Sequence, residues 1–158
     1  MQRTIKKLFI GSLLAAAAVP GVQASVDAYG SPGHALAVTR TIKIAALDSM
    51  KFQPSKVDVR PGQTVRFVIR NLGRQQPHEF LIGNRAEQRD YEALAEEHPG
   101  LRKLVDAPNG VTIPPGQTRT LIWHFPNRTG TLEYACHEPL HYAAGMVGYI
   151  HMTPEAPK

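Results

Sequence analysis

One short segment near the C-terminus gathers side chains that can bind a transition metal. Cys136, His141 and Met146 are spaced as Cys-x4-His-x4-Met, between two stretches with the alternating pattern of strands. Strand parity places the Cys136 sulfur on the inward face, and Pro139 and Gly145 are suited to bending the loop back towards it. A thiolate, imidazoles and a weak thioether are the ligands of a type 1 copper site. Zinc more usually takes four strong nitrogen, sulfur or oxygen ligands.

Such a site needs a second imidazole, and His78 is the best candidate for it. His78 shares strand parity with Phe80 and Ile82, which have the pattern of core residues, and it follows Pro77 at the start of a strand. An isolated inward histidine is more often a hydrogen-bonded core residue, but the Cys-His-Met loop favours a ligand here. The other histidines fit a ligand less well, because of strand parity or because they lie outside the strands: His34, His98, His124, His137 and His151.

The elements that must position these residues are mostly short strands. Period-2 apolar patterns at 42–44, 57–59, 65–69, 121–125 and 132–136 are bounded by Pro, Gly and Asn, which predicts an antiparallel sandwich or barrel. The segments 57–64 and 111–118 resemble each other, and both carry Pro-Gly-Gln-Thr before an apolar strand. Pro-Gly suits the centre of a type II turn, because glycine accepts a positive φ. We therefore expect two similar strand-turn-strand units.

One helix is predicted between the strands. Asn84 can cap its N-terminus, with Glu87 as the reciprocal partner of a capping box. Tyr91, Leu94, Ala95 and His98 recur at i, i+3, i+4 and i+7, the spacing of one helical face. A Pro-Gly pair at 99–100 ends the run, so the helix has about three turns.

The composition indicates one small exported domain. The 158 residues are 42% hydrophobic and 20% charged, which excludes collagen, extended low complexity and wholesale disorder. Residues 1–7 carry three basic and no acidic side chains, residues 8–19 are apolar but too short to span a bilayer, and 22–24 offer small residues for cleavage. Residues 1–24 are therefore predicted to be a signal peptide. Its removal leaves 15 basic and 13 acidic side chains, so +2 instead of +5, and a nucleic-acid partner is not expected.

Export makes the single cysteine informative. Oxidising compartments favour paired thiols, and Cys136 has no partner in its own chain. It is an inert core residue, half of an intermolecular disulfide, a nucleophile or a metal-bound thiolate. A thiol hydrolase would need His137 or His141 as its base, but neighbouring strand residues point apart and no oxyanion arrangement is recognisable. A copper oxidase would need further histidine clusters. We therefore do not expect an enzyme.

Together these features resemble the cupredoxins, the type 1 copper family of plastocyanin, azurin and rusticyanin. The motif is His78 followed by Cys136-x4-His141-x4-Met146 near the end of a short-stranded β domain. The Met-x-Phe-x-Pro segment at 50–54 and the Pro-Gly-Gln-Thr turns also match the family. The four-residue spacers on both sides of His141 are closest to rusticyanin- and auracyanin-like members.

The resemblance implies an all-β Greek-key sandwich with one short inserted helix, spanning 39–153 after a flexible leader at 25–38. It also implies one copper ion per chain, held by His78, Cys136 and His141 in a trigonal plane with Met146 as the axial ligand. His141 would form a partly exposed edge where electrons enter and leave, and redox partner proteins would dock beside it.

The residue after the first ligand histidine departs from the family pattern. Many cupredoxins carry Asn or Ser there, which ties the two ligand loops together, whereas this chain has Glu79. By strand parity the Glu79 side chain points away from the metal, and it is expected to tune the site without ligating it.

Two functions fit this site. The main hypothesis is a periplasmic mononuclear copper protein that acts as a one-electron carrier, monomeric and without a membrane attachment after signal cleavage. The alternative is a periplasmic copper-tolerance protein that binds, buffers or oxidises copper, since the His-Glu-Phe triplet at 78–80 and the inserted helix resemble such cupredoxins. The mature leader has only His34 and no methionine, and the lack of a Met- or His-rich tract favours the carrier.

Overall fold

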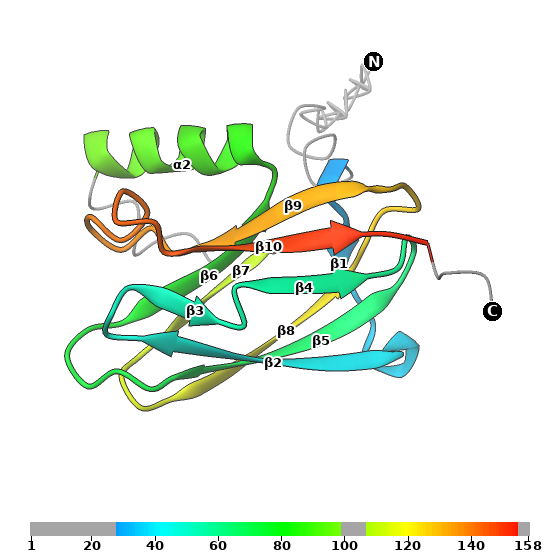
Figure 1. Cartoon of the computed structure of the whole chain (residues 1–158), viewed down its shortest axis with the longest axis horizontal. Coiled ribbons are helices and arrows are strands. Elements are labelled where there is room, and N and C mark those ends of the chain that lie inside the picture. Colours follow the sequence, from blue (N-terminus) through cyan, green and yellow to red (C-terminus); the bar gives the residue numbers. More distant parts are fainter. Residues whose placement is uncertain (1–27, 99–106, 155–158) are drawn as a thin grey trace, which may run out of the picture.

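The strands form two five-stranded sheets that face each other, with one α-helix on the outer side (Figure 1). The structure is a computed structural model that describes residues 28–98 and 107–154, so the expected signal peptide at 1–24 lies outside the described residues. Sheet A has the order β1 (Ser31–Pro32), β8 (Thr118–His124), β5 (Thr64–Asn71), β2 (Arg40–Leu47) and β3 (Lys51–Gln53). Sheet B has the order β4 (Lys56–Val59), β10 (Val147–Met152), β9 (Gly130–Ala135), β6 (His78–Gly83) and β7 (Gly110–Ile113).

The pairing of the strands is mixed. β2 pairs with β5, and β4 with β10, in parallel, whereas the other pairs are antiparallel. The chain passes from β3 in sheet A to β4 in sheet B and then back to β5, so the strands of each parallel pair are not consecutive in sequence. The all-β sandwich with one short helix is confirmed, but an entirely antiparallel pairing is not.

The core lies between the sheets and follows the predicted alternation. In β5 the side chains of Val65, Phe67 and Ile69 are fully buried, and each such burial stabilises the fold by about 1.5–3 kcal/mol. β6 differs, because all six of its residues are buried. Cys136 and Met146 belong to the same hydrophobic cluster as the core strands, so the predicted metal ligands are part of the core.

Both Pro-Gly turns have the predicted geometry. Gly62 and Gly116 each have a φ of +70°, the left-handed value that the third residue of a type II turn requires. The turns are closed by Gln63 N–H donating to Arg60 O and by Gln117 N–H donating to Pro114 O, both at 3.0 Å. They lead into β5 and β8, which pair side by side in sheet A.

The predicted helix is α2 (Arg85–Glu97), and its capping box is present. The Asn84 side chain accepts from the backbone N–H of Glu87, whose carboxylate accepts from Asn84 N–H in return. Its buried face differs from the predicted one: Leu94 is 49% exposed, and the buried residues are Gln88, Glu92 and Ala95. The predicted Pro-Gly stop at 99–100 lies outside the described residues.

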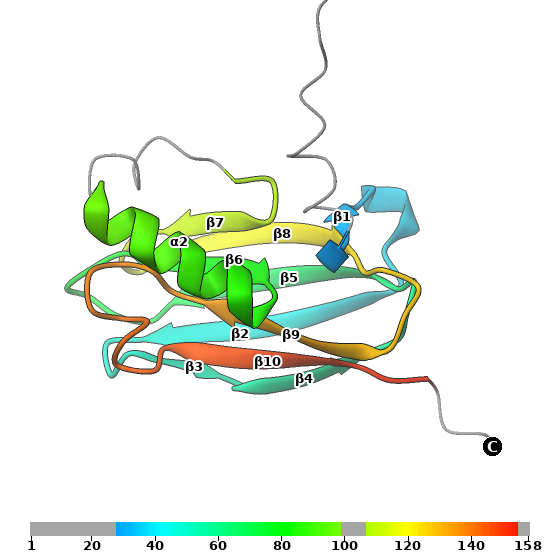
Figure 2. The ribbon, with the colours of Figure 1, turned by 90° about the horizontal axis from the view of Figure 1, so that it is seen from above.

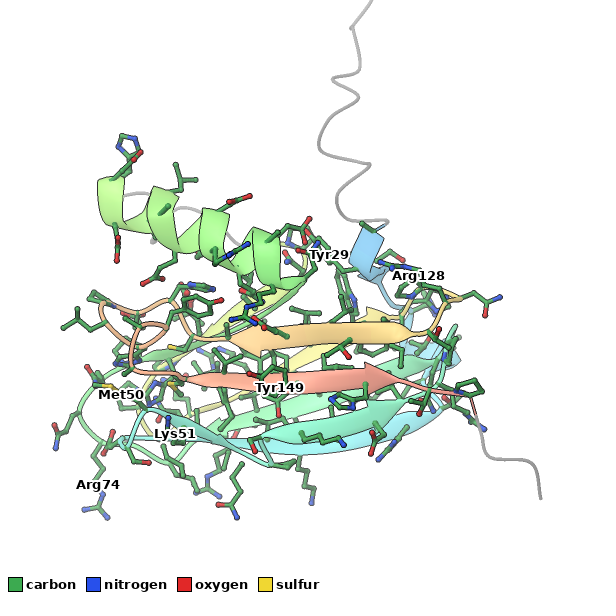
Figure 3. The ribbon with its side chains drawn as sticks, turned by 45° about the horizontal axis from the view of Figure 1, so that its top comes forward. Tyr29, Met50, Lys51, Arg74, Arg128 and Tyr149 are labelled. Carbon is green, nitrogen blue, oxygen red and sulfur yellow. The ribbon has the colours of Figure 1, made fainter. Side chains whose placement is uncertain are left out.

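The expected flexible leader differs from the structure where the structure describes it. β1 pairs with the edge of β8, and Trp123 Nε1 donates to Tyr29 O at 2.9 Å. The rings of Tyr29 and Trp123 stack at 6.2 Å, and Arg128 donates to Ala28 O beside them (Figure 3). Residues 28–33 therefore pack against β8 and cover this edge of sheet A. A short 3₁₀ turn, η1 (Ala35–Ala37), joins this segment to β2.

Candidate metal centre

Three predicted ligands converge at one end of sheet B. His78 is the first residue of β6, and Cys136 directly follows β9, the antiparallel neighbour of β6. His141 lies in the loop 137–146 that joins β9 to β10. Its Nδ1 is 3.2 Å from Cys136 Sγ and 3.3 Å from His78 Nδ1, and His78 Nδ1 is 3.9 Å from the sulfur. The structure thus brings two imidazoles and a thiol to one point.

The loop folds back through its own backbone. Leu140 and Gly145 have φ values of +71° and +80°, so the chain reverses direction where Gly145 was expected to bend it. Met146 N–H donates to His141 O at 2.9 Å, and Cys136 N–H donates to Met146 O at 3.1 Å. The first bond joins the end of the loop to His141, and the second joins the end of the loop to Cys136, just before its start.

Met146, the predicted axial ligand, is buried in the core, and its backbone is hydrogen-bonded to two of the other predicted ligands. Its side chain is fully buried in the core cluster that also contains Cys136. Its backbone bonds to Cys136 on one side and to His141 on the other. The axial role of its thioether stays a prediction.

Burial sets the protonation of the cluster. It raises the pKa of the Cys136 thiol to about 12, an effect that the backbone N–H groups of Glu79 and Glu138 oppose. The Glu79 N–H lies 3.2 Å from the sulfur. Burial also lowers the pKa of His78, helped by the charge of His141, and it lowers the pKa of His141. Both imidazoles are therefore neutral at neutral pH, with lone pairs available to a metal.

The donor set fits copper. The ligand atoms of His78, Cys136 and His141 all lie within 4.8 Å of one another, and all three residues are buried. Two neutral nitrogens and one soft sulfur in a dry site suit Cu(I) and Cu(II), and a bound cation stabilises the thiolate that burial alone disfavours.

His141 is more enclosed than the resemblance implied. Its side chain is 1% exposed, so it does not form a partly exposed edge. The neighbouring Leu140 is 73% exposed instead. Leu140 has a left-handed backbone with a φ of +71°, a conformation that is uncommon for residues other than glycine.

The Glu79 side chain does not belong to the metal cluster, in agreement with its strand parity. Glu79 is the buried second residue of β6, and it touches the site through its backbone N–H, which donates to Cys136 Sγ. A hydrogen bond to a metal-bound sulfur changes how strongly the thiolate donates. The tuning role of the Glu79 carboxylate stays a prediction.

His137 is the residue whose importance the sequence did not reveal. Parity correctly turns it away from Cys136, yet it is fully buried between the loop and α2. Its Nδ1 lies 2.7 Å from Glu92 Oε2, and its Nε2 lies 2.7 Å from Gln88 Oε1. Tyr142 stacks on the ring at 4.8 Å. The spacing of Gln88, Glu92 and Ala95 at i, i+4 and i+7 was the signal that could have found this face.

The other histidines that the structure describes do not belong to the cluster of His78, Cys136 and His141. His34 caps η1 by accepting from Leu36 N–H, and His124 bonds to the Thr64 hydroxyl at 2.9 Å. His98 forms the exposed end of α2. Met50 packs against the core cluster as a partly buried residue.

A β-sandwich that buries two imidazoles and a thiol at the end of adjacent strands has the architecture of a mononuclear copper protein. The chain matches the model for copper-binding proteins of the plastocyanin/azurin family over residues 38–153, and it belongs to that family. Copper is therefore its cofactor, and the resemblance to cupredoxins is confirmed.

Individual relatives and a solved structure are similar to most of this chain. The chain is 38% identical to the copper-resistant cuproprotein CopI of Rubrivivax gelatinosus, over 77% of this chain and 72% of the relative. It is 31% identical to the protein of the same name in Pseudomonas aeruginosa, over 93% of this chain and 94% of the relative. Dithionite-reduced auracyanin from Roseiflexus castenholzii superposes with a TM-score of 0.62 at 25% identity, covering 74% of this chain and 99% of that one.

Proposed function

We propose that this protein binds copper in the periplasm and contributes to copper tolerance. The observation that carries the proposal is the buried cluster of His78, Cys136 and His141, which fits copper in both oxidation states. The copper-resistant relatives, which match most of this chain, favour tolerance over the electron-carrier hypothesis.

Each residue of the cluster has a distinct task. Cys136 donates a thiolate, and the N–H groups of Glu79 and Glu138 stabilise its charge. His78 and His141 donate neutral nitrogens, while the core around them excludes water. When bound, copper supplies one-electron exchange between Cu(I) and Cu(II). A site that accepts both states can hold the metal under changing redox conditions, so buffering and electron transfer require the same ligands.

The surroundings of this function are also part of the proposal. Residues 1–24 direct export, and the mature protein begins at Ser25. No helix within the described residues is long and apolar enough to cross a membrane. Proteins that exchange electrons or copper with the site dock at the exposed Leu140 beside His141. N-terminal sequencing of the exported protein checks the cleavage site, and a chain that still began at Met1 would contradict it.

The decisive experiment combines a spectrum with a growth assay. Adding Cu(II) to the mature protein should produce an intense thiolate-to-copper absorption band. A deletion strain of the host should grow poorly on copper, and the wild-type gene should restore growth whereas Cys136→Ser should not. Normal growth of the deletion strain on copper, together with slowed electron transfer, would support the carrier hypothesis instead.

A further inference from the structure

The helix α2 reaches the metal centre through one buried glutamine. The Gln88 Nε2 donates to Leu81 O in β6 at 2.9 Å and to Glu133 O in β9 at 3.4 Å. These two strands carry His78 and lead to Cys136. Gln88 therefore attaches the helix to the strands that position two of the ligands. Figure 2 shows α2 lying over β6 and β9.

The same glutamine orients His137. Because its amide nitrogen donates to two carbonyls, its Oε1 is the acceptor that faces His137 Nε2 at 2.7 Å. The carboxylate of Glu92 lies on the opposite side of the ring, with its Oε2 also 2.7 Å from Nδ1. Hydrogen bonds at both nitrogens fix the position and the rotation of the imidazole.

The fixed ring is connected to both sides of the metal centre. His137 follows Cys136 directly, so the position of its ring constrains the peptide that orients the Cys136 sulfur. On its face it stacks with Tyr142, the residue after His141, at 4.8 Å and an interplanar angle of 29°. The ring of His137, the residue after Cys136, thus contacts Tyr142, the residue after His141.

We propose that Gln88 and Glu92 act as positioning residues, which hold His137 and through it place Cys136 and His141 for copper. We call Gln88, Glu92 and His137 the helix clamp. The proposal rests on the ligand set proposed above. In this proposal α2 orients His137, a role that packing against sheet B alone does not require.

Energetics support a positioning role. Buried polar side chains cost free energy unless they are hydrogen-bonded, and an apolar helix face would cover sheet B without that cost. Apolar packing is non-directional, however, and would leave the His137 ring free to rotate. Two short hydrogen bonds at opposite nitrogens supply the orientation that a metal site with little tolerance for movement needs.

The test compares three helix variants by two measurements. Glu92→Leu removes the acceptor, Glu92→Gln keeps an oxygen acceptor, and Glu96→Gln makes the matched charge change at an exposed position of the same helix. Amide hydrogen exchange is measured on the copper-free protein at the Cys136 and Met146 N–H groups, with Phe67 N–H in the core as reference. Absorption and EPR spectra are measured on the Cu(II) protein.

We expect Glu92→Leu to speed exchange at Cys136 and Met146 by about tenfold or more relative to Phe67, and to shift the thiolate-to-copper bands. Glu92→Gln should have a smaller effect in both measurements, and Glu96→Gln none. Gln88→Leu removes the other acceptor and should have the same two effects as Glu92→Leu. If Glu92→Leu does not fold, Gln88→Leu replaces it as the test of the helix clamp.

Two results would overturn the helix clamp. Folded variants with wild-type spectra and exchange would show that the clamp positions nothing. Equal acceleration at Phe67 would show that it contributes only general stability. Failure of the wild-type protein to develop the absorption band would instead contradict the proposed ligand set, because the exchange measurement needs no copper.

Discussion

His78 and Cys136 differ from His141 and Met146 in how the chain holds them. The first two stand at the ends of β6 and β9, where hydrogen bonds between strands fix the backbone. The other two lie in and at the end of the loop 137–146, which is held by its own turns. We therefore expect a rigid half of the site, set by the sheet, and an adaptable half in the loop that can follow the preferences of both copper oxidation states.

The loop itself has two unequal attachments. On one side the buried His137 joins it to α2. On the other, the exposed Lys51 in β3 donates from Nζ to the carbonyls of Ala144 and Gly145, each at 3.2 Å. Figure 3 shows Met50 and Lys51 at the same end of the sandwich as this loop. A buried, oriented attachment should matter far more than an exposed, flexible one.

The largest effect is expected from the rigid half. Cys136→Ser removes the only thiol in the chain, so the intense thiolate-to-copper band should disappear completely. The visible spectrum after addition of Cu(II) measures this. A serine variant that kept the colour would contradict a copper–thiolate bond and with it the assignment of function.

Substitution of the two histidines compares the two halves of the site directly, because His78 belongs to the sheet and His141 to the loop. His78→Gly and His141→Gly both remove a nitrogen ligand and should weaken the band strongly. Added imidazole should restore His141→Gly in part, because the loop can admit an outside ligand, and should restore His78→Gly less well. Recovery of the band is followed during imidazole titration. Equal recovery would show that strand and loop positions are equally rigid.

Met146→Leu should have a smaller effect on the chromophore than either histidine change. Leucine has a similar volume, so the buried position stays filled, and the colour and copper should both be retained. Loss of a weak thioether donor destabilises Cu(II) more than Cu(I), which should raise the reduction potential. Protein voltammetry measures this, and an unchanged or lower potential would argue against an axial role.

Lys51→Met should have the smallest effect. The substitution removes two exposed hydrogen bonds but keeps most of the apolar stem, so the free energy of unfolding should fall by less than about 1 kcal/mol. Spectrum and potential should stay as in the wild type. Thermal denaturation and the absorption spectrum are the measurements, and a shift as large as that of Glu92→Leu would remove the contrast between the two attachments.

The features that the sequence predicted well depend on short stretches of chain. Alternating apolar residues predicted the strands, Pro-Gly predicted both turns at Gly62 and Gly116, and Asn84 with Glu87 predicted the helix start. The convergence of His78, Cys136 and His141 was also predicted. Strand parity predicted that His78 and Cys136 face the core, and loop spacing predicted that His141 returns to Cys136. Both signals depend on backbone geometry that neighbouring residues determine.

The features that the sequence did not predict depend on distant partners. Leu94 was expected on the same face as Ala95. In the structure Gln88 and Glu92 are buried with Ala95 instead of Leu94, because His137 in another part of the chain forms hydrogen bonds with them. The packing of residues 28–33 depends on Trp123 and the edge of β8. Sequence patterns cannot reveal either fact, because they classify residues by polarity and not by the distant residues that they contact in the fold.

The amino-acid sequence predicts the types of metal donor, their order along the chain, the strands beside them and the turns between these strands. Each of these predictions follows from side-chain chemistry and from the two backbone periods of strand and helix. The three-dimensional fold adds that His141 is enclosed, that Leu140 is exposed in its place, and that a polar helix face contacts His137 behind Cys136. Burial and hydrogen bonding at those positions depend on chain segments far apart in sequence, and only folding brings these segments together.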